Sequence, residues 1–119
     1  VVMQEYASDW FELDKIKESP FMMYAVDIKD QKSNLIPAVT HVDNTCRIQT
    51  VTREQNQHLY NLLKTFNDET GVPMLLNTSF NLAGKAIVET LDDAISALRE
   101  SSFEYLYLPE IKTVLYIKN

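Results

Sequence analysis

The sequence predicts an α/β domain, because short apolar segments with strand character alternate with segments that have the periodicity of amphipathic helices. Two segments carry helix-capping residues, and the strand-like ones are rich in β-branched and aromatic residues. At 119 residues, 45% of them hydrophobic, the chain is long enough for a core of its own. We therefore expect one domain over residues 1–119, with a mixed sheet and helices packed against it.

The first quarter of the chain holds a short helical or irregular segment and one strand. Residues 6–16, YASDWFELDKI, offer Ser8 or Asp9 as an N-cap. After Pro20, the apolar run at residues 21–28 is too short for a typical helix and indicates a buried strand.

Residues 38–51, AVTHVDNTCRIQTV, predict two short strands around a turn at Asp43 and Asn44, since Asn tolerates positive φ. The second strand alternates in polarity. We expect one face to carry Cys46, Ile48 and Thr50, and the other to carry Arg47, Gln49 and Val51.

A helix follows the capping box formed by Thr52 and Gln55. Its expected apolar stripe has helical spacing, and Gly71 is its expected stop. Thr90 caps a second expected helix. The expected buried stripes are Leu59, Leu62, Leu63 and Phe66 in the first helix, and Leu91, Ala94, Ile95 and Leu98 in the second.

The remaining apolar segments predict strands. They are residues 73–79, 85–89, 103–109 and 112–119.

Charge and composition exclude several classes of protein. The net charge of −6 argues against nucleic-acid binding through a broad basic face. No apolar run approaches the ~20 residues of a membrane span, and no signal peptide opens the sequence. Cys46 is the single cysteine, so we expect no disulfide framework and a cytoplasmic location.

The segment LLNTSFN, residues 75–81, is the first candidate site. An apolar run ends there in Asn77, Thr78, Ser79 and Asn81, which offer hydroxyl and amide groups suited to phosphate or carbamoyl oxygens. By composition alone, the favoured interpretation is a polar turn that satisfies its own backbone.

Arg47 is the second candidate, because a guanidinium on a strand can hold a phosphate through two hydrogen bonds. The alternative is a surface arginine or one paired with Asp43. His41 and Asp43 would point to the same side of a strand, either as an acid–base pair, as half of a metal site, or with His41 orienting the Asp43 turn.

Three blocks together resemble the C-terminal domain of the O-carbamoyltransferases of antibiotic biosynthesis and nodulation-factor synthesis. They are IPAVTHVDNTCRIQTV, TGVPMLLNTSFN and AIVETLDDA, and the resemblance extends from about Tyr6 to about Leu108. It implies a YrdC-like fold, a mixed twisted sheet with packed helices, of which this chain forms the later part. The segment TSFNLAG is also similar to the Ser-x-Asn loop of YrdC-like proteins.

The resemblance implies that this domain joins carbamoyl phosphate and ATP, with Mg²⁺, into carbamoyl adenylate. An N-terminal Kae1-like domain with its own metal ion would then transfer the carbamoyl group to a hydroxyl acceptor. By the same resemblance Arg47 holds phosphate, Asn77 and Ser79 contact the carbamoyl and phosphate groups, and Asn81 supports the loop. His41 and Asp43 match a family stretch of open role, and no metal ligands are expected in this chain.

The basic stretch that precedes this region in the family, and the Kae1-like domain, lie outside these 119 residues. We therefore expect a fragment or separated piece that is inactive when isolated. Two alternatives are a non-catalytic nucleotide- or phosphate-binding module and a structural remnant.

Overall fold

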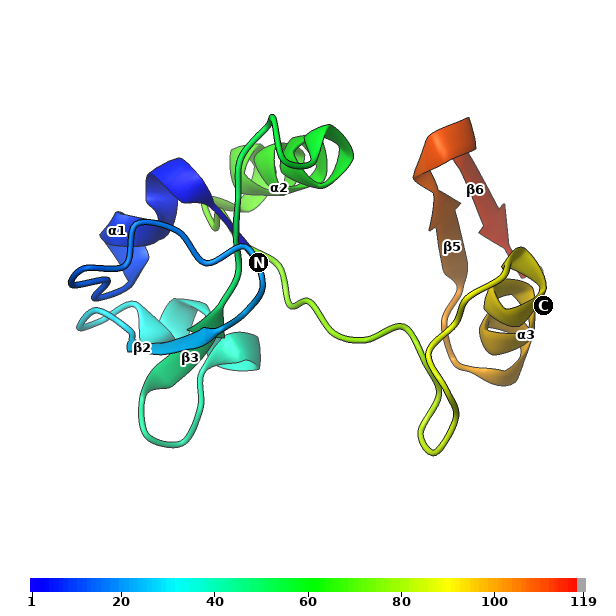
Figure 1. The fold of residues 1–119 in the computed structure, drawn as a ribbon, viewed down its shortest axis with the longest axis horizontal. Helices are drawn as coiled ribbons and strands as arrows, with labels where there is room; N and C mark the ends of the chain where they lie inside the picture. Colours follow the sequence, from blue (N-terminus) through cyan, green and yellow to red (C-terminus); the bar gives the residue numbers. More distant parts are fainter. Residues whose placement is uncertain (118–119) are drawn as a thin grey trace. The chain divides into compact units, whose positions relative to one another are not determined.

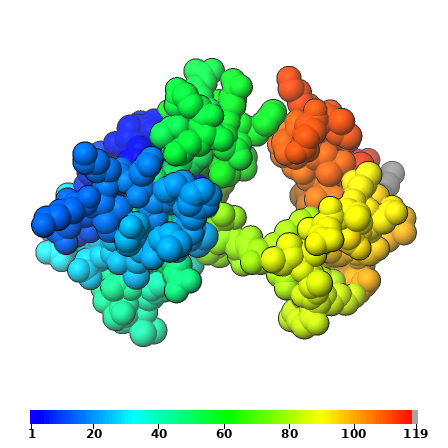
Figure 2. Space-filling model, viewed as in Figure 1, coloured from blue at the N-terminus to red at the C-terminus, as the bar shows by residue number. Residues whose placement is uncertain are grey.

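The computed structural model describes residues 1–117, and it contains both helices and strands, which confirms the α/β class (Figure 1). The chain divides into two compact units, Val1–Asn77 and Thr78–Asn119, which the sequence analysis did not anticipate. Figure 2 shows the close-packed atoms of residues 1–77 in blue to green. Among the described residues, no helix combines the length and the apolar character needed to cross a bilayer.

The first unit holds four strands and two α-helices. Its elements are β1 (Val2–Met3), η1 (Gln4–Tyr6), α1 (Ala7–Trp10), β2 (Tyr24–Asp27), η2 (Ser33–Leu35), η3 (Pro37–Val39), β3 (Thr45–Ile48), β4 (Thr50–Val51) and α2 (Gln57–Thr70). The second unit contains α3 (Leu91–Glu100), β5 (Tyr105–Leu108), η4 (Pro109–Ile111) and β6 (Thr113–Tyr116).

The strands of residues 1–117 form three two-stranded sheets instead of the single mixed sheet expected from the sequence. β1 pairs with β4 in parallel, whereas β2 with β3 and β5 with β6 pair antiparallel. Sequence patterns identify strands but not their partners, because pairing depends on tertiary contacts.

The core of the first unit lies between α1 and the strands β1, β2 and β3. Trp10 and Phe11 pack there, and the inward faces of β2 and β3 supply Val26, Cys46 and Ile48. The predicted alternation is confirmed from Cys46 to Thr50. Val51 was expected on the outer face but is buried with β1 and α2.

The expected strand before Asp43 is absent, because Pro37–Val39 forms the 3-10 turn η3 instead. Pro37 at its start has a restricted φ and no N–H for a strand ladder. The Thr40 hydroxyl donates to the Ile36 carbonyl at 2.9 Å, which closes the turn locally. Asn44 has φ of 64°, as expected for the turn residue.

Helix α2 begins later than predicted. The Thr52–Gln55 bonds form, but they close a turn, and Asn56 caps the helix by accepting from the Leu59 N–H at 3.0 Å. Gly71 ends the helix with φ of 74°. In helix α3, Thr90 is the cap as predicted, and its capping partner is Asp93.

Only part of each predicted apolar stripe is buried. In α2, Leu63 is fully buried, whereas Leu62 is 54% exposed. In α3 the buried residues are Ala94, Ala97 and Leu98, and Leu91 is 53% exposed. A helical pattern gives the direction of the apolar face, but the neighbouring elements decide how much of it is covered.

Two expected strands are irregular. Residues 73–75 run along β1 with bonds from Met3 N to Pro73 O and from Leu75 N to Val1 O, but only one bridge, Val2 to Met74, forms. Residues 85–89 make two recorded backbone bonds, from Lys85 N to Leu82 O and from Val88 N to Phe80 O, and neither belongs to a strand pair. Strands β5 and β6 confirm the two predicted C-terminal strands over residues 105–116, and residues 118–119 of that prediction lie outside the described part.

Candidate functional site

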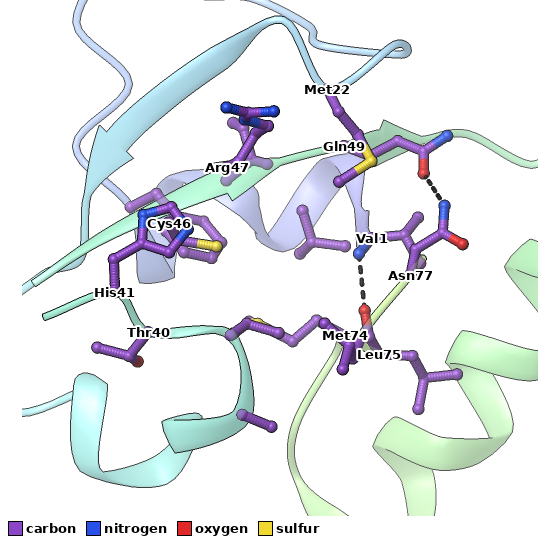
Figure 3. Close-up of a pocket in the computed structure, with 16 residues that line it drawn as sticks. Val1, Met22, Thr40, His41, Cys46, Arg47, Gln49, Met74, Leu75 and Asn77 are labelled. Atoms are coloured by element: carbon purple, nitrogen blue, oxygen red, sulfur yellow. Dashed lines mark hydrogen bonds between the residues drawn. The ribbon is translucent and has the colours of Figure 1, made fainter. Parts of the chain in front are cut away.

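A cavity of about 280 Å³ lies within the first unit, between strand β3 and the segment that follows helix α2 (Figure 3). Apolar side chains form most of its wall. Its polar lining residues are Thr40, His41, Arg47, Gln49 and Asn77. The cavity thus brings together three residues singled out from the sequence, Arg47, Asn77 and His41.

The charge of this cavity is opposite in sign to that of the chain. The net charge of the chain is −6, but the lining contains Arg47 and His41 and no Asp or Glu. Both residues are exposed to solvent, so their charges can attract an anion but are screened by water. The cavity is therefore suited to a small anionic ligand.

Arg47 is held by the backbone of β3 and has a free guanidinium. Its buried neighbours Cys46 and Ile48 anchor the strand, and its cross-strand partner is Ala25. Within residues 1–117, the Arg47 side chain makes no recorded hydrogen bond or ion pair, either with Asp43 or with Asp27 diagonally across the strands. The proposed pairing of Arg47 with Asp43 is therefore not found.

Asn77 lies at the open edge of the cavity, where it bonds to a residue that the sequence analysis did not single out. The Asn77 Nδ2 donates to Gln49 Oε1 at 2.6 Å, and Gln49 Nε2 donates to the Pro20 carbonyl at 3.0 Å. Figure 3 shows Gln49 and Asn77 meeting at one side of the cavity and His41 at the other, with Arg47 between them along β3. The alternation of β3, which places Gln49 on the face of Arg47, was the signal that could have identified it.

His41 and Asp43 meet through Thr45, in a turn that replaces the expected strand. The Thr45 hydroxyl donates to Asp43 Oδ1 at 2.7 Å, and His41 Nδ1 lies 2.9 Å from the same hydroxyl oxygen. Because the hydroxyl has one proton and gives it to the carboxylate, His41 Nδ1 is the donor to Thr45.

The Asp43 carboxylate is stabilised in its charged form. Hydrogen bonds from the Thr45 hydroxyl, and next from the Thr45 backbone N–H, lower the pKa of Asp43 below its ordinary value. Asp43 does not line the cavity but a separate hollow with Glu12, Asp27 and Asp30. These four carboxylates thus lie away from the cavity, in a hollow that Lys29 also lines.

Ser79 and Asn81 belong to the second unit, Thr78–Asn119. Asn81 Nδ2 donates to the carbonyls of Lys85 at 3.0 Å and Leu82 at 3.3 Å, so it closes its own loop. Ser79 is exposed, and its hydroxyl makes no hydrogen bond recorded for residues 1–117.

Within the part of the chain that the structure describes, no cluster of three or more His, Cys, Asp or Glu side chains is arranged to hold a metal ion. Cys46 is buried, and its burial raises the pKa of its thiol, so the thiol stays protonated.

Comparison with known protein families shows which family this chain belongs to. The family described as the carbamoyltransferase C-terminus matches residues 1–114. The chain belongs to the carbamoyltransferase C-terminal family. The match includes Arg47, Asn77, Ser79 and Asn81, and thus both the cavity and the loop of the second unit.

Two curated proteins contain a region that is similar in sequence to this carbamoyltransferase domain. The nodulation protein NolNO of Sinorhizobium fredii is 43% identical over 106 residues, which are 88% of this chain and 16% of the relative. The 3'-hydroxymethylcephem-O-carbamoyltransferase of Amycolatopsis lactamdurans is 36% identical over 78 residues, which are 66% of this chain and 15% of the relative. The chain thus spans about a sixth of the length of these relatives.

Proposed function

We propose that this domain is the C-terminal part of an O-carbamoyltransferase and contributes to the ATP-dependent activation of carbamoyl phosphate to carbamoyl adenylate. Transfer of the carbamoyl group to a hydroxyl acceptor would follow in an N-terminal Kae1-like domain. The observation that carries this proposal is Arg47, unpaired in a cavity whose lining has no carboxylate. A cephem O-carbamoyltransferase among the relatives supports the acceptor class.

The residues in the cavity suit the charges of this reaction. Water first releases inorganic phosphate from carbamoyl phosphate and leaves carbamate. A carbamate oxygen then attacks the α-phosphorus of ATP, pyrophosphate leaves, and negative charge grows on the phosphoryl oxygens. The Arg47 guanidinium can offset that charge, and neutral amides can orient the donor without adding repulsion. The cavity offers no carboxylate for Mg²⁺, so Mg²⁺ would be held by the phosphate oxygens of ATP.

A second candidate is a binding module that holds a phosphate-bearing ligand without turnover. It is favoured by the small number of cationic groups, since Arg47 and His41 alone could supply positive charge from the lining side chains.

We also propose a cytoplasmic location, because both carbamoyl phosphate and ATP would be drawn from a metabolic pool.

The test is carbamoyl-phosphate-dependent exchange between ATP and pyrophosphate, measured in the complete protein with its upstream domain. Arg47→Ala should weaken ligand binding by about 1.5–3 kcal/mol, as expected for a charge-assisted hydrogen bond. Arg53→Ala is the matched control, since Arg53 is exposed and does not line the cavity. Equal ligand affinity in Arg47→Ala and the parent would refute the assignment, and binding without exchange in the parent would favour the second candidate.

A further inference from the structure

His41 is held in place at three atoms, although its side chain is exposed. Its backbone N–H donates to the Thr45 carbonyl at 2.8 Å, and its carbonyl accepts from the Asn44 N–H at 3.1 Å. Its ring atom Nδ1 lies 2.9 Å from the Thr45 hydroxyl oxygen. The orientation of the ring is therefore fixed by hydrogen bonds within the turn, without burial in the core.

The hydrogen bonds of Thr45 determine which nitrogen of the His41 ring carries a hydrogen. The charged Asp43 carboxylate can only accept, so the Thr45 hydroxyl gives it its single proton, at 2.7 Å. The hydroxyl oxygen must then accept from His41, and Nδ1 carries the hydrogen. In a neutral imidazole the other nitrogen, Nε2, is then the proton acceptor. A proton taken up by Nε2 would be stabilised by the negative charge of Asp43, which reaches the ring through Thr45.

The Nε2 side of the ring is the side that His41 can present to the cavity. His41 lines the cavity, whereas Thr45 and Asp43, which lie at the Nδ1 side, do not. No hydrogen bond to Nε2 is recorded for residues 1–117. Figure 3 shows His41 at one end of the cavity, with Arg47 farther along β3. Nε2 is thus free to bond to a water molecule or a ligand.

Among the lining side chains that the structure describes, only His41 can take up a proton at neutral pH. The other titratable side chains of the lining are Arg47 and Cys46, and the lining has no Asp or Glu. A guanidinium is always protonated. Burial raises the pKa of the Cys46 thiol, which therefore also stays protonated. A proton released to a side chain in this cavity would go to His41.

We propose that His41 is the general base that accepts a proton from water when inorganic phosphate is released from carbamoyl phosphate. This inference rests on the proposed function. The water oxygen bonds to phosphorus, the bond from phosphorus to the bridging oxygen breaks, and its electron pair leaves with carbamate. The water proton passes to His41 Nε2 and from there to solvent.

The other residues of this arrangement have separate roles. The attack is placed at phosphorus because the Arg47 guanidinium suits the phosphoryl oxygens, on which charge grows during the displacement. Thr45 and Asp43 are positioning residues, since they act through the Nδ1 side of His41 and do not line the cavity.

The test separates the release of phosphate from the adenylation step in the complete protein. Carbamate forms when bicarbonate and ammonia are mixed, so it can be supplied directly. His41→Gln should lower kcat for phosphate release from carbamoyl phosphate about 100-fold or more, with little change in KM. Exchange between ATP and pyrophosphate that is supported by bicarbonate and ammonia should fall far less, because carbamate bypasses the step. In water labelled with a heavy oxygen isotope, the parent should incorporate the label into the released phosphate.

His58→Gln is the matched control, because His58 is exposed in α2 and does not line the cavity. It should change neither rate. Thr45→Val removes the acceptor for Nδ1 and should lower kcat for phosphate release about two- to tenfold, the effect of one neutral hydrogen bond. Thr45→Ser keeps the hydroxyl and should restore the rate.

The dependence of kcat on pH distinguishes a base from a structural residue. The rate of the parent should fall as the pH drops and His41 becomes protonated, and His41→Gln should lack this decrease. The other titratable groups near His41 are Asp43, Arg47 and Cys46. The first is charged and the other two are protonated throughout the neutral range, so they do not produce the decrease.

Equal phosphate release by His41→Gln and the parent, or released phosphate without the isotope label, overturns the role of His41 but leaves the proposed function standing. Equal losses of phosphate release and of carbamate-supported exchange in His41→Gln would show a structural role and overturn it as well. A parent that neither releases phosphate from carbamoyl phosphate nor exchanges pyrophosphate overturns the proposed function, and this inference with it.

Discussion

Ser79 separates the two interpretations of the LLNTSFN segment at the scale of one side chain. If the segment were only a turn, its hydroxyl would bond to the local backbone, but no such bond is recorded within residues 1–117. We therefore expect Ser79→Ala to leave the free energy of unfolding nearly unchanged. Adenylation, measured as pyrophosphate exchange in the complete protein, should fall about tenfold or more, or about 1.4 kcal/mol in transition-state terms.

The control for this measurement is Ser102→Ala, a second exposed serine, which should alter neither quantity. A Ser79→Ala protein that is destabilised but exchanges pyrophosphate at the parental rate would show that the segment is a turn.

Asp43 gives a pH-dependent prediction. Hydrogen bonds from Thr45 lower its pKa in the folded state, so the carboxylate stabilises the fold above its ordinary pKa of about 3.9. This contribution is lost as the pH falls from about 4 through the lower folded-state value. Thr45→Val should raise the pKa of Asp43 toward the ordinary value in an NMR titration of its carboxyl carbon.

Thr65→Val is the control for Thr45→Val, because the Thr65 hydroxyl bonds to the Asn61 carbonyl within α2 and does not touch Asp43. An Asp43 pKa that is the same in Thr45→Val as in the parent would contradict the hydrogen-bond explanation.

At the scale of an element, helix α2 contains two adjacent leucines with opposite environments. Leu63 is fully buried against Met3 and Val51, whereas Leu62 is 54% exposed. Leu63→Ala should lower the free energy of unfolding by about 2–5 kcal/mol, since it removes buried methyl groups and leaves a cavity. Leu62→Ala should cost less than about 1 kcal/mol. Urea unfolding of both variants checks the difference, and equal losses would show that the helix is packed on another face.

At the scale of the whole molecule, the chain spans 16% of the nodulation relative and 15% of the cephem carbamoyltransferase. The lining of its cavity contains one arginine. Among residues 1–117, no cluster of His, Cys, Asp or Glu side chains is arranged to hold a metal ion. We therefore expect residues 1–119 alone, incubated with ATP, carbamoyl phosphate and hydroxyl acceptors, to give no carbamoylated product by mass spectrometry. Product formation by the isolated chain would refute the division of labour between domains.

Features set by neighbouring residues could be predicted from the sequence. The Thr90–Asp93 cap, the left-handed Gly71 and the turn at Asn44 follow from bonds or backbone preferences within a few residues. The alternation in β3 also identified the buried positions up to Thr50, because a strand turns successive side chains to opposite faces.

Features that need a distant partner could not be predicted. Residues 85–89 have a strand-like composition, but no strand among residues 1–117 pairs with them. The capping box at Thr52 formed outside the helix because Asn56 offered a cap closer to the first turn. The separation into three small sheets follows from pairings that no local pattern specifies.

The candidate site combines both kinds of information. The sequence by itself determined the family and the residue types, including Arg47, Asn77 and the polar loop that follows. Only the tertiary structure decided that Arg47 and Asn77 share a cavity without carboxylates, and that Gln49 joins Asn77 to Pro20. The physical reason is that β1 lies between β4 and residues 73–75, so its hydrogen bonds bring two segments separated by more than twenty residues to one cavity.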